Sequence, residues 1–160
     1  MFSQTAEYAL RAMTCLARFS EGPLTTAEIA RVSRVPAGYL SKVLQQLARA
    51  DLVTAVRGLR GGYRLKRESS EITILQVLNA VDPLQRIHSC PLGLPEHGTR
   101  LCLLHRRLDE SLARVEEVLG ATFLRDVLSD RAEELPLCPG PCGRQSPAAP
   151  RRAAPPGEPG

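Results

Sequence analysis

Residues 25–65 read TTAEIARVSRVPAGYLSKVLQQLARADLVTAVRGLRGGYRL, and this stretch decides the fold. It opens with Thr25 and Glu28, which form a capping box and predict the start of a short helix. Residues 33–36 predict a turn, and Pro36 fits the first turn of a second helix that runs to about residue 50. The second helix has one apolar face at helical spacing, made of Leu40, Val43, Leu44 and Leu47. Two short helices at this separation are typical of a helix-turn-helix.

A hairpin is predicted directly after the second helix. Residues 52–56 form one expected strand, and residues 63–65 alternate in polarity as a returning strand. Glycines mark the tip between them, at Gly58, Gly61 and Gly62. Arginines follow the same hairpin, at Arg57, Arg60 and Arg64. A short basic hairpin behind a helix-turn-helix predicts a wing.

Two further helices complete the predicted domain. Residues 3–20 carry an apolar face at helical spacing, and Ser3 can cap the start of this helix. Residues 73–81 form another amphipathic pattern. The expected fold is therefore mainly α, with a winged helix-turn-helix over residues 1–82 that includes a two-stranded wing.

A long helix is predicted over residues 101–119. Its apolar positions recur at steps of three and four, at Leu101, Leu104, Leu108, Leu112, Val115 and Leu119. A chain this small has little else to cover such a stripe, so we expect a homodimer built on this C-terminal helix. Gly120 is predicted to end it, and Thr122 to cap a short packing helix, which gives a unit of residues 101–130.

Two segments lie outside these helices. Residues 83–100 form a long predicted loop, and loops of this length are usually functional or held by a bound group. Residues 131–160 form a proline-rich tail that we expect to be disordered. Cys138 and Cys142 at the start of this tail are expected to be exposed to solvent.

Composition narrows the class of protein. The formal net charge of +4 is compatible with a polyanionic partner but does not identify one. No apolar run is long enough to cross a membrane, and residues 1–10 lack the order of a secretory signal, so a cytoplasmic protein is expected. Five cysteines in a reducing compartment favour thiol chemistry, metal binding or core packing over disulfides. No phosphate loop, H-E-x-x-H zinc motif or nucleophile elbow is present, so an enzyme is not expected.

The helix-turn-helix and the wing predict binding to double-stranded DNA. Small residues on the outer face of the second helix, Gly38 and Ser41, would allow close approach to a major groove, where Lys42 and Gln45 could reach bases or phosphates. A wing arginine among glycines could enter a minor groove. The same features also fit a solvated helix face or a winged-helix module that binds protein, so the residues alone leave both functions open.

Several motifs resemble the Rrf-type winged-helix transcription regulators, the family of IscR and NsrR. They are SQTAEYALRA at 3–12, Tyr39-Leu40, VRGLRGGYRL at 56–65 and the stretch 74–82. The resemblance spans about residues 1–130 and implies a dimer on a near-palindromic operator, with the long helix as its interface. The predicted DNA contacts are then Thr26, Gly38, Tyr39, Ser41, Lys42, Gln45, Arg57 and Arg60.

The resemblance also implies an iron–sulfur cluster. Many members carry three cysteines at intervals of six before the long helix, with a histidine after them or an acidic residue in the first helix as a further ligand. Cys90 and Cys102 match the first and third cysteines, but Glu96 stands in place of the second. The expected ligands are Cys90, Cys102, His105 and Glu7. A 2Fe–2S cluster is favoured, and zinc or no metal is the alternative. We hypothesise that the site senses redox state, nitric oxide or iron supply. Glu7 could instead simply pair with Arg11.

Overall fold

The computed structural model describes residues 2–58, 61–91 and 100–129. In chain order these residues form α1 (Gln4–Arg18), α2 (Thr26–Ser33), α3 (Ala37–Arg49), β1 (Val53–Val56), β2 (Gly62–Leu65), α4 (Ile74–Val81), α5 (Leu103–Ala121) and α6 (Leu124–Ser129). The mainly α fold with a two-stranded wing is confirmed, and the boundaries lie within about two residues of those predicted. Some predicted features fall outside the described residues: the tail 131–160 with Cys138 and Cys142, the wing residue Arg60, and Glu96.

The helix starts follow from local capping signals. The Ser3 hydroxyl accepts a hydrogen bond from the backbone N–H of Ala6, as predicted. The capping box of Thr25 and Glu28 is present at the start of α2. A second capping box, between Thr73 and Gln76, starts α4 and was not predicted. These caps fix where α2 and α4 begin, and so fix which of their faces point into the core.

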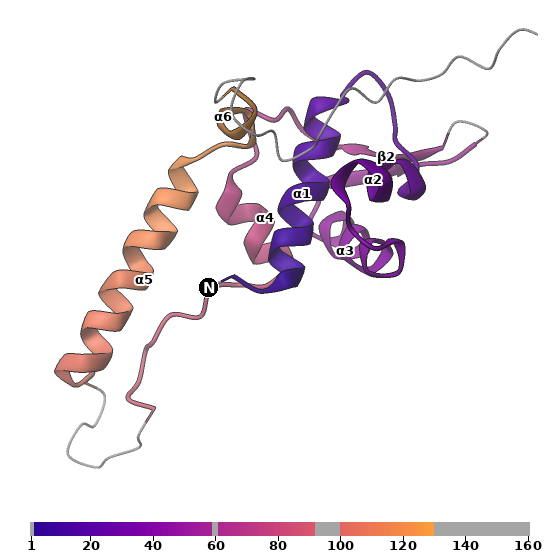
Figure 1. The fold of residues 1–160 in the computed structure, drawn as a ribbon. Helices are drawn as coiled ribbons and strands as arrows, with labels where there is room; N and C mark the ends of the chain where they lie inside the picture. The colour runs from indigo at the N-terminus through magenta and orange to yellow at the C-terminus, as the bar shows by residue number, and fades with distance from the viewer. Residues whose placement is uncertain (1, 59–60, 92–99, 130–160) are drawn as a thin grey trace, which may run out of the picture.

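α1 is the central helix of the domain. It packs against α2, α3, α4 and α6, and its buried face contains Ala6, Ala9, Ala12, Met13, Cys15 and Leu16. Figure 1 shows α1 between α4 on one side and α2 and α3 on the other. The predicted stripe of α3, from Leu40 to Leu47, is buried against this centre. Since the aromatic content is low, the core consists mainly of Ala, Val, Leu and Ile side chains, with Met13 and Cys15 among them.

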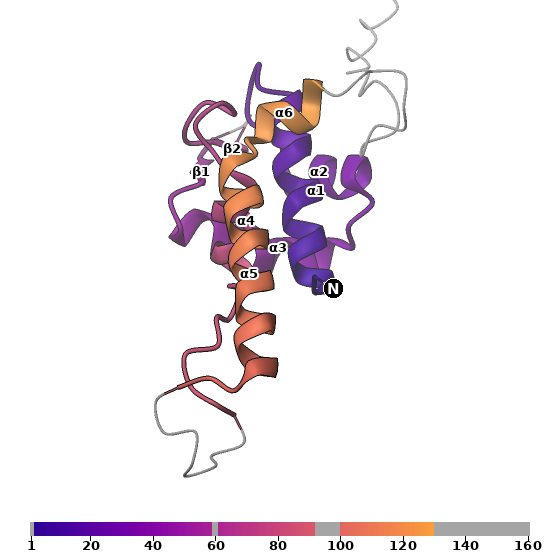
Figure 2. The same ribbon diagram turned by 90° about the vertical axis from the view of Figure 1, so that its left-hand side faces the viewer.

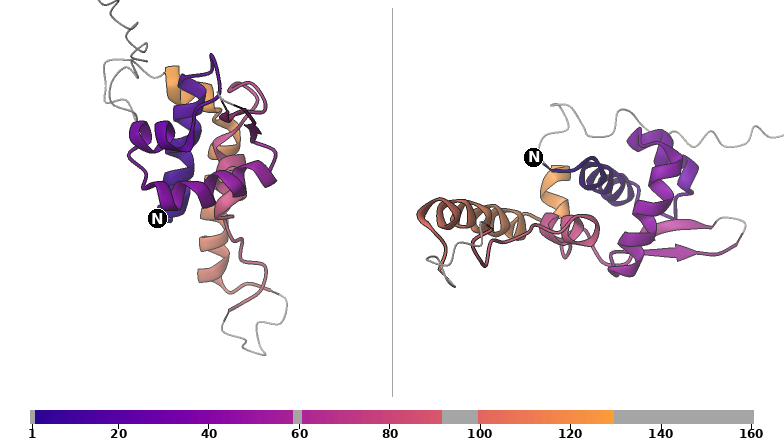
Figure 3. Two further views of the ribbon diagram at one scale, coloured as in Figure 1. Left: turned by 90° about the vertical axis from the view of Figure 1, so that its right-hand side faces the viewer. Right: turned by 90° about the horizontal axis from the view of Figure 1, so that it is seen from below.

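The wing is an antiparallel pair in which Val53 lies opposite Leu65 and Val56 opposite Gly62. Figure 3 shows this hairpin extending beyond the helices. The hairpin is crowded where β2 begins, because a Cβ atom on Gly62 would lie 2.3 Å from the carbonyl oxygen of Leu24. Gly58 near the tip has a φ of +117°, a conformation that favours glycine. The backbone thus requires two of the predicted hairpin glycines for different reasons.

α5 leaves the domain and projects away from it (Figures 1 and 2). None of its residues is buried. Its C-terminal end is fixed by two backbone hydrogen bonds: Ile74 N–H donates to Thr122, and Leu124 N–H donates to Ile72. Segment 82–91 runs antiparallel to α5, beside its N-terminal half, in both views.

Two predictions about the end of α5 are wrong. Gly120 does not end the helix, which continues to Ala121, and a Cβ atom at Gly120 would lie 3.4 Å from Cδ2 of Leu75. Thr122 does not cap α6, because its hydroxyl donates to the carbonyl of Val118 instead. At the start of α6 the N–H of Phe123 donates a hydrogen bond to the carboxylate of Asp126.

Candidate DNA-binding surface and metal centre

The outer face of α3 carries most of the predicted DNA contacts. Gly38, Tyr39, Ser41, Lys42 and Gln45 are all exposed there. Pro36 provides no side-chain cap, so the N–H groups of Ala37 and Gly38 at the start of α3 could donate to an acceptor such as a phosphate. Thr26, at the first position of α2, is half-buried. The helix therefore presents small and polar groups that suit contact with a groove.

Tyr39 connects this face to α1. Its side chain is 63% exposed, and its ring centroid lies 6.2 Å from that of Tyr8. The hydroxyl of Tyr8 in turn accepts a hydrogen bond from the side-chain amide of Gln4. Such tilted ring pairs are favourable, so Tyr8 holds the exposed tyrosine in place at the start of α3.

An ion pair fixes the wing to the end of α3. Asp51, just after α3, has a left-handed φ of 62°, and its carboxylate lies 2.6 Å from the Lys66 ammonium after β2. The hydrogen bond and charge of Lys66 lower the pKa of Asp51. The N–H of Lys66 also donates to the carbonyl of Leu52. Arg57, which is exposed at the far end of β1, is thus carried on a hairpin whose base is tied to α3.

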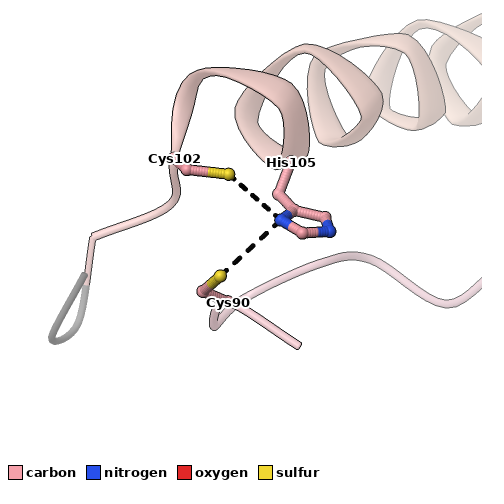
Figure 4. A group of neighbouring side chains, drawn as sticks. All are labelled: Cys90, Cys102 and His105. Carbon is pink, nitrogen blue, oxygen red and sulfur yellow. Dashed lines mark hydrogen bonds between the residues drawn. The ribbon is translucent and has the colours of Figure 1, made fainter. Parts of the chain in front are cut away.

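Three of the four predicted metal ligands come together at the start of α5 (Figure 4). The Sγ of Cys102 lies 3.2 Å from Nδ1 of His105, and the Sγ of Cys90 lies 3.7 Å from the same nitrogen. The three ligand atoms lie within 4.8 Å of one another. Cys90 is buried, and the other two residues are half-buried. Cys102 is the N-cap residue of α5, so the helix start places both Cys102 and His105.

This spacing fits a bound metal. In a tetrahedral site with zinc-like bond lengths, a thiolate sulfur and an imidazole nitrogen lie about 3.5 Å apart. The two measured separations, 3.2 and 3.7 Å, lie on either side of that value. Two thiols and an imidazole can therefore hold one zinc ion, or one iron of a cluster, and leave a fourth position for another ligand.

Glu7 is not part of this group. It lies on the exposed side of α1 and pairs with Arg11, four residues further along the same helix. In the single chain Glu7 therefore forms the ion pair with Arg11 that was the alternative to its role as a metal ligand.

Sequence reasoning missed a polar network beside the metal ligands. The guanidinium of Arg86 binds both carboxylate oxygens of Asp109, at 2.6 and 2.7 Å, and reaches Glu116 at 3.0 Å. The N–H of Ile87 also donates to Asp109, at 2.9 Å. These hydrogen bonds lower the pKa of Asp109 to about 2. The partners are 23 positions apart in the chain, and no local spacing pattern indicates such a pair.

The helix-turn-helix, the tied wing and the basic exposed groups define a winged-helix transcription regulator that binds DNA. Comparison with known proteins leads to the same class of protein. Residues 2–130 match the Rrf2 family model, described as an iron-dependent transcriptional regulator, and the chain belongs to this family. None of the described helices has the length and apolar character needed to cross a membrane.

Relatives and solved structures cover most of the chain. An HTH-type regulator of Mycobacterium tuberculosis (strain ATCC 25618 / H37Rv) is 38% identical over 130 residues, which is 78% of this chain and 79% of the relative. One of Aquifex aeolicus (strain VF5) is 28% identical over 84% of this chain and 96% of the relative. CymR, the global cysteine regulator of B. subtilis, is 27% identical with a TM-score of 0.67, over 81% of this chain and 96% of CymR. T. potens IscR is also 27% identical, with a TM-score of 0.68, over 81% of this chain and 87% of IscR.

Proposed function

We propose that this protein is a homodimeric, cytoplasmic regulator whose affinity for its operator depends on a metal centre at Cys90, Cys102 and His105. The observation that carries the proposal is the convergence of two thiols and one imidazole within 4.8 Å. These residues lie on two separate segments, so loading or removal of a metal would change how segment 82–91 sits on α5. Such a local change of order is a known route to switching DNA affinity. The role is regulatory and requires no catalysis.

DNA contact is proposed through α3 and the wing. The exposed residues of α3, chiefly Lys42 and Gln45, would read a major groove, and Arg57 would enter the neighbouring minor groove. Tyr39, Ser41 and Gly38 would lie against the DNA surface, and Thr26 would meet the backbone at the start of α2. Arg60 belongs to the same proposal, although it lies outside the described residues.

Dimer formation is proposed through α5. This helix has no buried residue and exposes Leu103, Leu104, Leu108, Val115 and Val118. Leu104, Leu108 and Val115 belong to the stripe predicted from the sequence. A row of exposed leucines and valines on a projecting helix is costly in water, and a second copy would cover it symmetrically. Two chains joined this way would present two α3 helices to the two halves of a palindromic operator.

The metal itself has two candidates. Iron in a 2Fe–2S cluster is the first, because the matching family model describes iron-dependent regulators. Zinc is the second, because both sulfur–nitrogen separations suit a single tetrahedral ion. A 2Fe–2S cluster needs ligands on both irons, so at least one ligand beyond these three would complete it.

Anaerobic isolation tests the proposal. Absorption spectra with iron, sulfide and zinc analysis identify the metal, and titration of a promoter-derived palindromic DNA gives the affinity with and without it. We expect Cys90→Ala and Cys102→Ala to lose the metal and shift the DNA affinity toward that of the metal-free protein. Cys138→Ala is the control and should change neither. A colourless, metal-free protein with unchanged DNA affinity in both variants would overturn the proposed sensing role.

A further inference from the structure

The segment that carries Cys90 meets α5 at two places. The first is the metal-ligand group, where Cys90 faces His105. The second lies four residues earlier on the segment, where Arg86 faces Asp109, four residues later on the helix. The segment and the helix therefore run antiparallel between two fixed points. One helical turn separates the two points on the α5 side.

The Arg86 contact has the geometry of a specific clamp. Its Nε and Nη2 donate to the two oxygens of Asp109, and its Nη1 donates to Glu116. The side chains are 30%, 17% and 28% exposed, so water only partly reaches them. Planar, two-point pairing of this kind fixes orientation as well as distance, which a lysine could not reproduce.

Asp109 also holds the backbone of the segment. Its Oδ1 accepts the N–H of Ile87, three residues before Cys90. The carboxylate thus binds a side chain and a peptide group of the same segment, and it sets the direction in which the chain approaches the ligand group. An ordinary surface ion pair, such as Arg107 with Glu110, joins two residues three positions apart on α5 itself, and within the described residues neither side chain is hydrogen-bonded to segment 82–91.

We propose that Arg86 is a positioning residue for the metal centre: its clamp on Asp109 holds Cys90 against α5 before the metal arrives. This inference rests on the proposed function. Residues behind the ligands that orient them typically change metal affinity by about 10–100-fold when they are removed. Removal of the clamp would free Cys90 to leave the ligand group while Cys102 and His105 stayed in place on α5.

The test uses the full chain and two readouts. The first is the alkylation rate of Cys90 in the metal-free protein, followed by mass spectrometry of the Cys90 peptide. The second is the affinity for Co²⁺, followed by the thiolate-to-cobalt absorption band. Arg86→Ala should speed alkylation and weaken Co²⁺ binding about 10–100-fold. Arg86→Lys should recover only part of the affinity, because it restores the charge but not the two-point geometry.

Arg107→Ala is the matched control, because it removes an arginine and an ion pair from α5 without touching the segment. It should change neither readout. Unchanged Co²⁺ affinity and alkylation in Arg86→Ala would overturn the inference and leave the proposed function standing. A wild-type protein that binds no metal, but whose Cys90 becomes more reactive in Arg86→Ala, would overturn the sensing role and leave the positioning of Cys90 by Arg86 standing. Helix content measured by circular dichroism shows whether α5 remains folded in each variant.

Discussion

Leu24 and Tyr63 exchange two backbone hydrogen bonds, at 2.9 and 2.7 Å, and so join the connection between α1 and α2 to the second strand of the wing. β2 is therefore paired with β1 on one side and with Leu24 on the other. This close approach explains why Gly62, next to Tyr63, has no room for a side chain. The position of the wing relative to the helix-turn-helix depends on this contact.

Gly62→Ala should destabilise the protein. Its Cβ would lie 2.3 Å from the carbonyl oxygen of Leu24, so backbone must move, at a cost of about 1–3 kcal/mol. Urea denaturation measures the free energy of unfolding. Gly38→Ala is the control, because a Cβ there meets no atom within 4 Å. Equal stability of the two variants would contradict the crowding argument.

Gly38→Ala should affect DNA binding instead of folding. The added methyl group would stand between α3 and the floor of the groove, and the affinity for the operator should fall about tenfold, the scale of a single base contact. Fluorescence anisotropy with a labelled operator measures this. Gly120→Ala changes a glycine on α5 and should leave the affinity unchanged. An undiminished affinity in Gly38→Ala would mean that α3 does not approach the DNA at this residue.

Arg57→Ala should reduce the salt dependence of DNA binding. A dimer of the variant lacks two such interactions, one from each chain, so the slope of log affinity against log salt should fall by about two. Affinities measured over a series of salt concentrations give the slope. Arg114→Ala removes an exposed arginine from α5 and should leave the slope as it is. The same slope in both variants would place the wing away from the DNA.

Leu104→Glu combined with Leu108→Glu should give a monomer. Both side chains are exposed in the single chain, at 63% and 47%, so the change costs the fold little but puts charge into the proposed interface. Light scattering after gel filtration measures the mass. Arg106→Glu, on the opposite side of α5, should remain a dimer. A dimer in the double variant would exclude this stripe as the interface.

The clamp between Arg86 and Asp109 predicts that the free energy of unfolding depends on pH. Asp109 has a folded-state pKa of about 2 against an ordinary value of 3.8, because the Arg86 and Ile87 groups donate to its charged form. Its contribution to stability is therefore complete above about pH 4 and is lost as the pH falls toward 2. Urea unfolding of wild type and Asp109→Asn at a series of pH values should show a stability difference that shrinks over this range. A difference that stays constant from pH 5 to below pH 3 would contradict it.

The sequence predicted what local signals encode. Ser3 and the Thr25–Glu28 box lie within three residues of the groups they bind, so the helix starts could be located. The predicted end of α5 was wrong, because tertiary contacts near Leu75 outweigh the low helix propensity of Gly120.

The candidate site was predicted in part. Cys102 and His105 share one helix turn, so their proximity follows from spacing, and the family resemblance added Cys90. Arg86 and Asp109 could not be found in this way, because their pairing depends on how a non-helical segment folds back over 23 positions. The Leu24 and Tyr63 contact was missed for the same reason, since nothing near Leu24 resembles a strand.

The two ends of α5 are both connected to α4, one by hydrogen bonds and the other by segment 82–91. α5 has 19 residues, so its two ends lie about 28 Å apart. Its N-terminal end carries the ligands Cys102 and His105. The residues after its C-terminal end are hydrogen-bonded to Ile72 and Ile74 at the start of α4. Segment 82–91 returns from the ligands to the other end of α4. Strain created at Cys90 would therefore reach the same short helix from both of its ends, and α4 packs directly on α3.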